Sequence, residues 1–120
     1  MASCEQFAGT LPSNLKGLGS GQIDAVKSSV RVSGTGGQSC YVEIKNNSLH
    51  FTPIRVRYFV VGEGGVERDL CATRYQIASF GTDVFKYSVF GERISWNTEV
   101  SLAADVDAAL LLVRVLADPV

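Results

Sequence analysis

The stretch Asn46–Val61, NNSLHFTPIRVRYFVV, joins a turn to a strand. Asn46–Ser48 and Pro53 are typical of turns, whereas the residues from Ile54 onward are mostly β-branched or aromatic. Successive side chains of a strand point to opposite faces, so the strand divides by parity. One face carries Ile54, Val56, Tyr58 and Val60, and the other carries Arg55, Arg57, Phe59 and Val61. The first is a core face, and the second is either exposed to solvent or covered by a partner.

Short strands of the same kind recur along the chain, separated by turns every 8–12 residues or so. We expect strands at 23–33, 40–45, 54–61, 66–78, 84–90 and 94–102. The glycine clusters at 34–37 and 62–65 predict hairpin turns, because both separate two strands. With a C-terminal element, this pattern predicts an all-β antiparallel sandwich or barrel of about seven strands.

The two ends of the chain are less regular. Residues 105–117, DVDAALLLVRVLA, fit a short helix with Asp105 as its N-cap, or a strand that is buried on both faces. The all-β context favours the strand. Residues 1–22 contain Pro12 and several glycines, so we expect an irregular N-terminal arm, with residues 23–120 forming a single domain. The predicted core comprises Val30, Val32, Val42, Ile44, Ile54, Val56, Tyr58, Val60, Ile77, Trp96, Val100, Leu111 and Val113.

The charge balance narrows the range of partners. The 120 residues include 11 basic and 12 acidic side chains, for a net charge of −1, so a domain-wide footprint for nucleic acid is absent. No stretch approaches the roughly 18 apolar residues of a membrane span, and no signal peptide is visible. We therefore favour the cytoplasm or a virion over export, although a removed signal would leave no trace.

Three cysteines, Cys4, Cys40 and Cys71, match no zinc-binding spacing. Cys40 and Cys71 would pair if their strands were neighbours in an oxidising compartment. The simpler interpretation, which we favour, is that both are small buried hydrophobic residues. Cys4, near the terminus, is the expected free thiol.

Residues suited to catalysis are sparse. His50 is the only histidine, and neither a nucleophile nor a third orienting group accompanies it in the sequence. Asp105 and Asp107 are explained by capping or turn formation, and neither glycine cluster is a phosphate loop. We expect no enzymatic activity, no cofactor and no metal site.

Basic and aromatic residues offer a better candidate site. The predicted contact surface comprises Arg55, Arg57, Phe59, Arg74, Phe85 and Tyr87. Such residues on a sheet face serve protein interfaces and, in some modules, single-stranded nucleic acid. The alternative is a solvated face, with the arginines paired to Glu43, Glu67 and Asp69 on neighbouring strands.

Residues 42–90 resemble a known family. VEIKNNSLHFTPIRVRYFVVGEGGVERD and YQIASFGTDVFKYSV are similar to the central and later segments of small immunoglobulin-like bacterial domains of the FxLYD type. The family's tyrosine-aspartate is absent, since Tyr58 is followed by Phe59. The resemblance implies an immunoglobulin-like β-sandwich that serves as a spacer or interaction module without an active site.

Taken together, these observations predict a non-catalytic structural or interaction module that self-associates, with itself or another protein as partner. Three alternatives stay open: a small coat or decoration protein of a virus or phage, an RNA- or polyanion-binding module, and an exported spacer domain.

Overall fold

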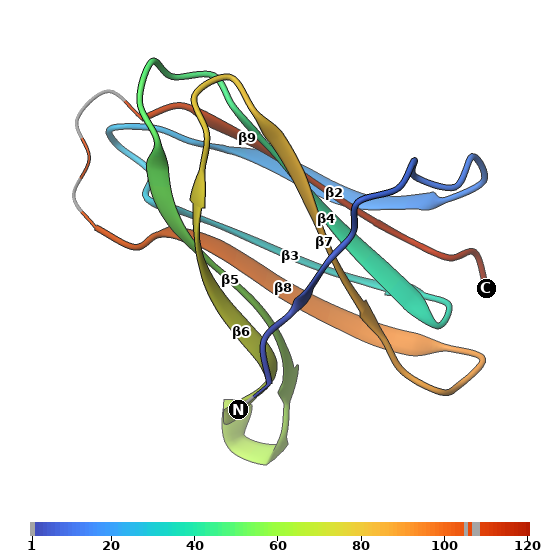
Figure 1. Cartoon of the computed structure of the whole chain (residues 1–120). Coiled ribbons are helices and arrows are strands. Elements are labelled where there is room, and N and C mark those ends of the chain that lie inside the picture. The colour runs from blue at the N-terminus through green and yellow to red at the C-terminus, as the bar shows by residue number, and fades with distance from the viewer. Residues whose placement is uncertain (1, 105, 107–108) are drawn as a thin grey trace.

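Two antiparallel sheets face each other in the computed structural model, which describes residues 2–104, 106 and 109–120 (Figure 1). The five-stranded sheet has the order β1 (Glu5–Gln6), β7 (Thr82–Ser88), β4 (Ser39–Asn46), β9 (Leu111–Ala117), β2 (Lys16–Ile23). The four-stranded sheet has the order β3 (Ser29–Gly36), β8 (Ile94–Leu102), β5 (Thr52–Val61), β6 (Glu67–Ile77). The prediction of an all-β antiparallel sandwich is confirmed, and the architecture is consistent with an immunoglobulin-like sandwich.

Most of the connections cross from one sheet to the other. Strands β5 and β6 form a hairpin within one sheet, and a single 3-10 turn, Glu63–Gly65, joins them. The expected hairpin at 34–37 is wrong, because β3 and β4 lie in different sheets. That corner is tight: a Cβ atom on Gly36 would lie 2.5 Å from the Cβ of Ala117, so a larger residue would clash.

The core between the sheets contains every residue predicted for it except Val60. A β-bulge shifts the register of β5 against β6 between Tyr58 and Phe59, with Leu70 of β6 as the extra residue. Val60, near the end of β5, is partly exposed, whereas Phe59 is buried on the outer face of the sheet and not in this core. Tyr58 spans the interior, and its hydroxyl donates to a backbone oxygen of Cys40 at 2.8 Å or Phe85 at 3.0 Å.

The C-terminal element is a strand. β9 pairs with β4 on one side and β2 on the other. The prediction that it is buried on both faces is wrong, because only alternate side chains are buried and Leu112 is 41 % exposed. The capping role considered for Asp105 lies outside the described residues.

The N-terminal region corrects the prediction of an irregular arm at 1–22. Residues 16–23 form β2, an eight-residue edge strand, and residues 5–6 form β1 against β7. Glycines fit the narrow space beside β3: a Cβ on Gly21 would lie 2.8 Å from Val30. Conversely, the strand expected at 23–33 is interrupted, since β2 ends at Ile23 and β3 begins at Ser29.

The cysteines pair differently from either expectation. Cys4 and Cys71 form a disulfide across a sequence separation of 67, and Cys40 is the free thiol. Cys40 is fully buried, and burial raises the pKa of its thiol to about 12. A thiol with such a pKa is almost entirely protonated at neutral pH and is a poor nucleophile.

Among the described residues, no helix has the length and apolar character needed to cross a membrane.

Candidate contact surface

Arg57 lies at the centre of the outer face of the four-stranded sheet, where β5 has β6 on one side and β8 on the other. Its guanidinium donates to Glu67 at 2.5 Å, Asp69 at 2.6 Å and Glu99 at 2.9 Å. Burial lowers the pKa of Arg57, but the hydrogen bonds to these three carboxylates outweigh it and raise the pKa above its ordinary value. Because three carboxylates surround the guanidinium, its positive charge is already neutralised. Arg57 is therefore poorly suited to bind an anionic ligand.

Phe59 lies beneath two arginines of the same face. The guanidinium carbons of Arg57 and Arg31 stand 4.1 Å and 4.8 Å from the centre of its ring. Arg31 is also ion-paired with Glu67, and hydrogen bonds from Arg57 and Arg31 lower the pKa of that carboxyl. The stacked cations cover the ring, which is only 2 % exposed. This cover explains how Phe59 is buried on an outer face.

The other predicted contact residues do not form one surface. Arg55 lies opposite Arg74 on β6 and pairs with Asp69 at 3.3 Å. Phe85 is buried, with its ring 5.5 Å from that of Tyr75, and Tyr87 packs against the core beside Trp96. The prediction that both aromatics belong to the contact surface rests on residue type and is wrong, because β7 directs them toward the core. The structure therefore brings together Arg55, Arg57, Phe59 and Arg74, and excludes Phe85 and Tyr87.

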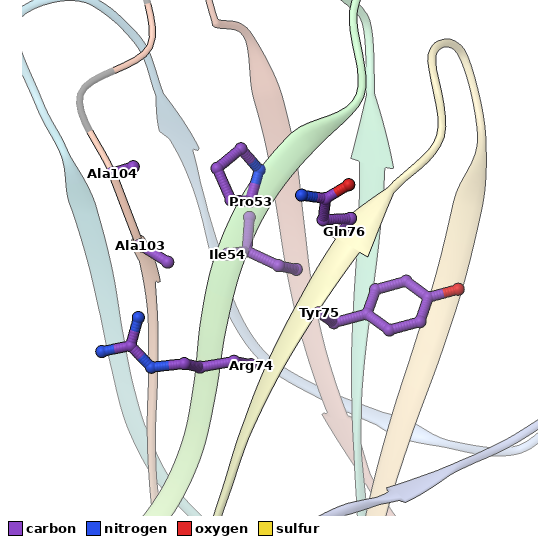
Figure 2. Close-up of a pocket in the computed structure, with 7 residues that line it drawn as sticks. All are labelled: Pro53, Ile54, Arg74, Tyr75, Gln76, Ala103 and Ala104. Atoms are coloured by element: carbon purple, nitrogen blue, oxygen red, sulfur yellow. The ribbon is translucent and has the colours of Figure 1, made fainter.

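An open depression of about 440 Å³ lies beside this arginine-bearing face (Figure 2). Arg74 extends across β5 toward Ala103, and Pro53 and Gln76 line the other end (Figure 2).

A second surface lies at one end of the sandwich, where exposed apolar side chains occupy two adjacent loops. We call residues 47–51, between β4 and β5, and residues 78–81, between β6 and β7, the loop end. Leu49, Phe51 and Phe80 are 76 %, 63 % and 59 % exposed, and neither loop contains an acidic residue, lysine or arginine. The two loops lie side by side at the top of Figure 1. Aromatic residues are enriched, and charged residues depleted, at the centre of a protein interface.

Asn46 holds the two loops together. Its side chain is fully buried, and its amide nitrogen lies within 3.0–3.1 Å of the backbone oxygens of His50, Ile77 and Ala78. Its amide oxygen accepts from the backbone nitrogen of Ser48 at 3.1 Å and the hydroxyl of Ser48 at 2.6 Å. One side chain thus satisfies backbone groups from both loops. The same burial prevents Asn46 from carrying a glycan in the folded chain, although Asn46–Ser48 matches the acceptor pattern.

Phe80 adopts an uncommon backbone conformation, with φ at +55° in the left-handed region. It belongs to a turn that Gly81 closes by donating its backbone nitrogen to the oxygen of Ala78 at 2.9 Å. Left-handed conformation costs an L-residue about 1–2 kcal/mol, and glycine or asparagine is favoured at such positions. The turn therefore presents a large exposed ring at a position where a small residue would be less strained.

Sequence reasoning missed the loop end. The sequence predicts a turn at Asn46–Ser48 and indicates no role for Leu49, Phe51 or Phe80. The available signal was apolar residues inside segments otherwise typical of loops, such as Leu49 and Phe51 flanking His50. His50 is an exposed loop residue. In the described part of the chain, no group of three or more histidine, cysteine, aspartate or glutamate side chains is placed to hold a metal ion.

Comparisons with known proteins found no matching family model, no matching curated protein and no matching solved structure.

Proposed function

We propose that this chain is a non-catalytic interaction module that self-associates through its loop end. The observation that carries the proposal is the position of Leu49, Phe51 and Phe80 on two loops that Asn46 holds in a fixed arrangement. A fixed apolar surface loses little conformational entropy on binding, which favours association. The strained turn at Phe80 supports the same conclusion, because backbone strain that persists in a stable fold is concentrated at functional positions.

The size of the surface sets the expected strength of association. Leu49, Phe51 and Phe80 expose roughly 350 Å² of side-chain surface together, well below the roughly 800 Å² that each partner buries in a standard interface. We therefore expect a weak, concentration-dependent dimer, with a dissociation constant on the order of 10⁻⁴ M. Such a module would act through many copies or through a neighbouring contact.

Light scattering after size exclusion, from about 10 μM to 1 mM, tests the proposal on the scale set by that affinity. The wild type should rise above the mass of one chain, whereas Phe51→Ser should stay monomeric. Phe90→Ser is the matched control, because Phe90 is a fully exposed phenylalanine at the opposite end of the sandwich. A wild-type mass of one chain at every concentration, or equal losses in both variants, would refute the assignment to the loop end.

The arginine-bearing face supports a polyanion-binding role less well. Arg57 is surrounded by three carboxylates, and Arg31 and Arg55 each have an acidic partner. A polyanion would have to displace these carboxylates before it could reach the arginines, and like charges would remain nearby.

An exported spacer domain is the second candidate, and the Cys4–Cys71 disulfide favours it. Structural disulfides persist in oxidising compartments and are rare in the cytosol. Alkylation of the protein as isolated from its own cells, under denaturing conditions, would decide the matter by mass spectrometry. An exported chain should take up label at Cys40 alone, whereas label on all three cysteines would place the chain in a reducing compartment.

A further inference from the structure

The N-terminal segment, residues 2–7, lies between β6, the edge strand of the four-stranded sheet, and β7, to which it adds β1 as the edge of the other sheet (Figure 1). Its first half follows β6: the backbone nitrogen of Ala72 donates to the oxygen of Ala2 at 3.1 Å, and that of Cys4 donates to the hydroxyl of Thr73 at 2.6 Å. Its second half pairs with β7, where Glu5 lies opposite Lys86. We call this segment the strap. It bridges two sheet edges that would otherwise be exposed.

Side-chain contacts make the strap specific to its gap. Cys4 is 5 % exposed and is bonded to Cys71 of β6, within the hydrophobic core. Phe7 donates its backbone nitrogen to Val84 at 2.8 Å, and its ring packs edge-on against Tyr41 at 5.3 Å between centres. The gap is therefore a binding site for an extended segment. That segment must carry a cysteine and, three positions later, an aromatic residue.

The strap is joined to β2 by a linker of residues 8–15. Six of these eight residues are exposed, and the contacts of the strap described above involve none of them. A linker of eight residues can extend over about 25–30 Å. An arm from a second chain can make the same contacts, because every one of them is between residues 2–7 and the body of the sandwich.

We propose that the gap between β6 and β7 binds the strap of a second copy of this chain, with the Cys4–Cys71 disulfide then formed between copies. Exchange of an identical element between protomers is a low-cost route to oligomers, since each contact is kept. The disulfide makes one oligomeric state covalent. Formed within one chain it closes a monomer, and formed between chains it links two copies. This surface is separate from the loop end, so the inference goes beyond the proposed function.

The covalent step requires an oxidant, for which oxidised glutathione serves. The thiolate of Cys71 attacks one glutathione sulfur and releases the first glutathione thiolate. The thiolate of Cys4 from the second copy then attacks the mixed disulfide and releases the second. Two cysteine thiols thus lose two electrons to glutathione, and their two protons are taken up by the two released thiolates.

Two complementary chains test the proposal, both carrying Cys40→Ala so that no third thiol reacts. One carries Cys4→Ala and retains Cys71 in its gap, and the other carries Cys71→Ala and retains Cys4 in its strap. After mixing with oxidised glutathione, we expect a covalent heterodimer on a non-reducing gel, with the Cys4–Cys71 link identified by peptide mass spectrometry. Glutathione-blocked monomers or Cys4–Cys4 homodimers alone would overturn the proposal.

Phe7→Ala in the strap-donating chain, the one that carries Cys71→Ala, tests whether the disulfide forms after the strap docks or after random collision. Loss of the contact with Tyr41 should lower the heterodimer yield roughly threefold to tenfold. Thr10→Ala in the exposed linker is the control and should leave the yield unchanged. Equal yields from all three strap-donating chains would overturn the proposal, whereas Phe51→Ser should not affect the yield whatever its effect at the loop end.

The wild-type chain provides a second measurement that does not depend on the folding of a variant. The chain is reduced and then reoxidised with glutathione at low and at high concentration. A fraction of Cys4–Cys71-linked dimer that grows with concentration supports the proposal, and monomer alone at every concentration overturns it.

Discussion

Asn46→Asp replaces the amide that joins the two loops with a group of the same shape. The buried amide nitrogen donates to carbonyl oxygens at 3.0–3.1 Å, and a carboxylate oxygen in its place would face the same acceptors without a proton. Each lost hydrogen bond costs about 1 kcal/mol, and leaving buried acceptors unsatisfied costs about 1–3 kcal/mol more. We therefore expect the free energy of unfolding to fall by about 3–5 kcal/mol at neutral pH.

The stability that Asn46→Asp loses should depend on pH, with a larger loss at high pH than at low pH. Burial and the facing carbonyl oxygens disfavour the ionised form, so the introduced carboxyl should have a pKa in the folded state above its unfolded value. Between the two pKa values the folded state binds more protons, and stability falls as the pH rises. The difference from wild type should be smallest near about pH 4 and largest above about pH 7.

Urea unfolding at both pH values measures this difference, with the fluorescence of the buried Trp96, the only tryptophan, as the signal. Asn47→Asp is the matched control, because it makes the same chemical change at the next residue, which is partly exposed. If the two variants lose equal stability, or if the loss at Asn46 is the same at both pH values, the account of the buried amide is wrong.

Three further changes test other parts of the structure. Replacing Cys4 and Cys71 together by alanine should lower the free energy of unfolding by about 4 kcal/mol, because the disulfide closes a loop with a sequence separation of 67; equal denaturation midpoints would contradict this. Phe80→Gly should be about 1 kcal/mol more stable than Phe80→Ala in thermal unfolding, since only glycine is free of the left-handed strain. Arg57→Met should lower the free energy of unfolding by about 2 kcal/mol at neutral pH, because three partly buried carboxylates then lack their cation. The decrease should be smaller in acid. Glu67 stabilises the folded wild type while it is ionised, because its pKa is lowered in the folded state. This stabilisation is present above the unfolded pKa of Glu67 and is lost as the pH falls, so low pH should reduce the effect of the Arg57 change. High salt should reduce it as well, because salt screens the charges.

The periodicity of the sequence predicts much of this fold because most strands bury one face. In β8, Trp96, Thr98 and Val100 alternate with polar residues, and their burial follows from that alternation. The C-terminal strand is predictable from its apolar run in an all-β chain, although only one of its two faces is buried. These signals are local and need no knowledge of the partner strand.

The features that sequence reasoning missed depend on contacts between distant residues. Parity places Phe59 on the same face as Arg57, but its burial there also requires Arg31 of β3 and the carboxylates of β6 and β8, which no pattern within β5 indicates. The strand Lys16–Ile23 is rich in glycine and has weak β-propensity, and it forms because β9 and β3 are beside it.

The candidate site was only partly predictable. Arg55 and Arg57 lie on an outer face as their parity indicates, but the carboxylates that neutralise them come from β6 and β8. Phe85 and Tyr87 face inward because β7 belongs to the other sheet, an assignment that the sequence leaves open. Residue type alone therefore identified basic and aromatic side chains without showing which of them share a surface.

The most direct test of self-association through the loop end is a dilution series followed by amide NMR chemical shifts. We predict that, between about 10 μM and 1 mM, the concentration-dependent shifts are concentrated at residues 47–51 and 78–81, while the amides around Arg57 and Phe90 stay constant. Shifts that spread over the arginine-bearing face, or spectra that do not change with concentration, would contradict the proposal.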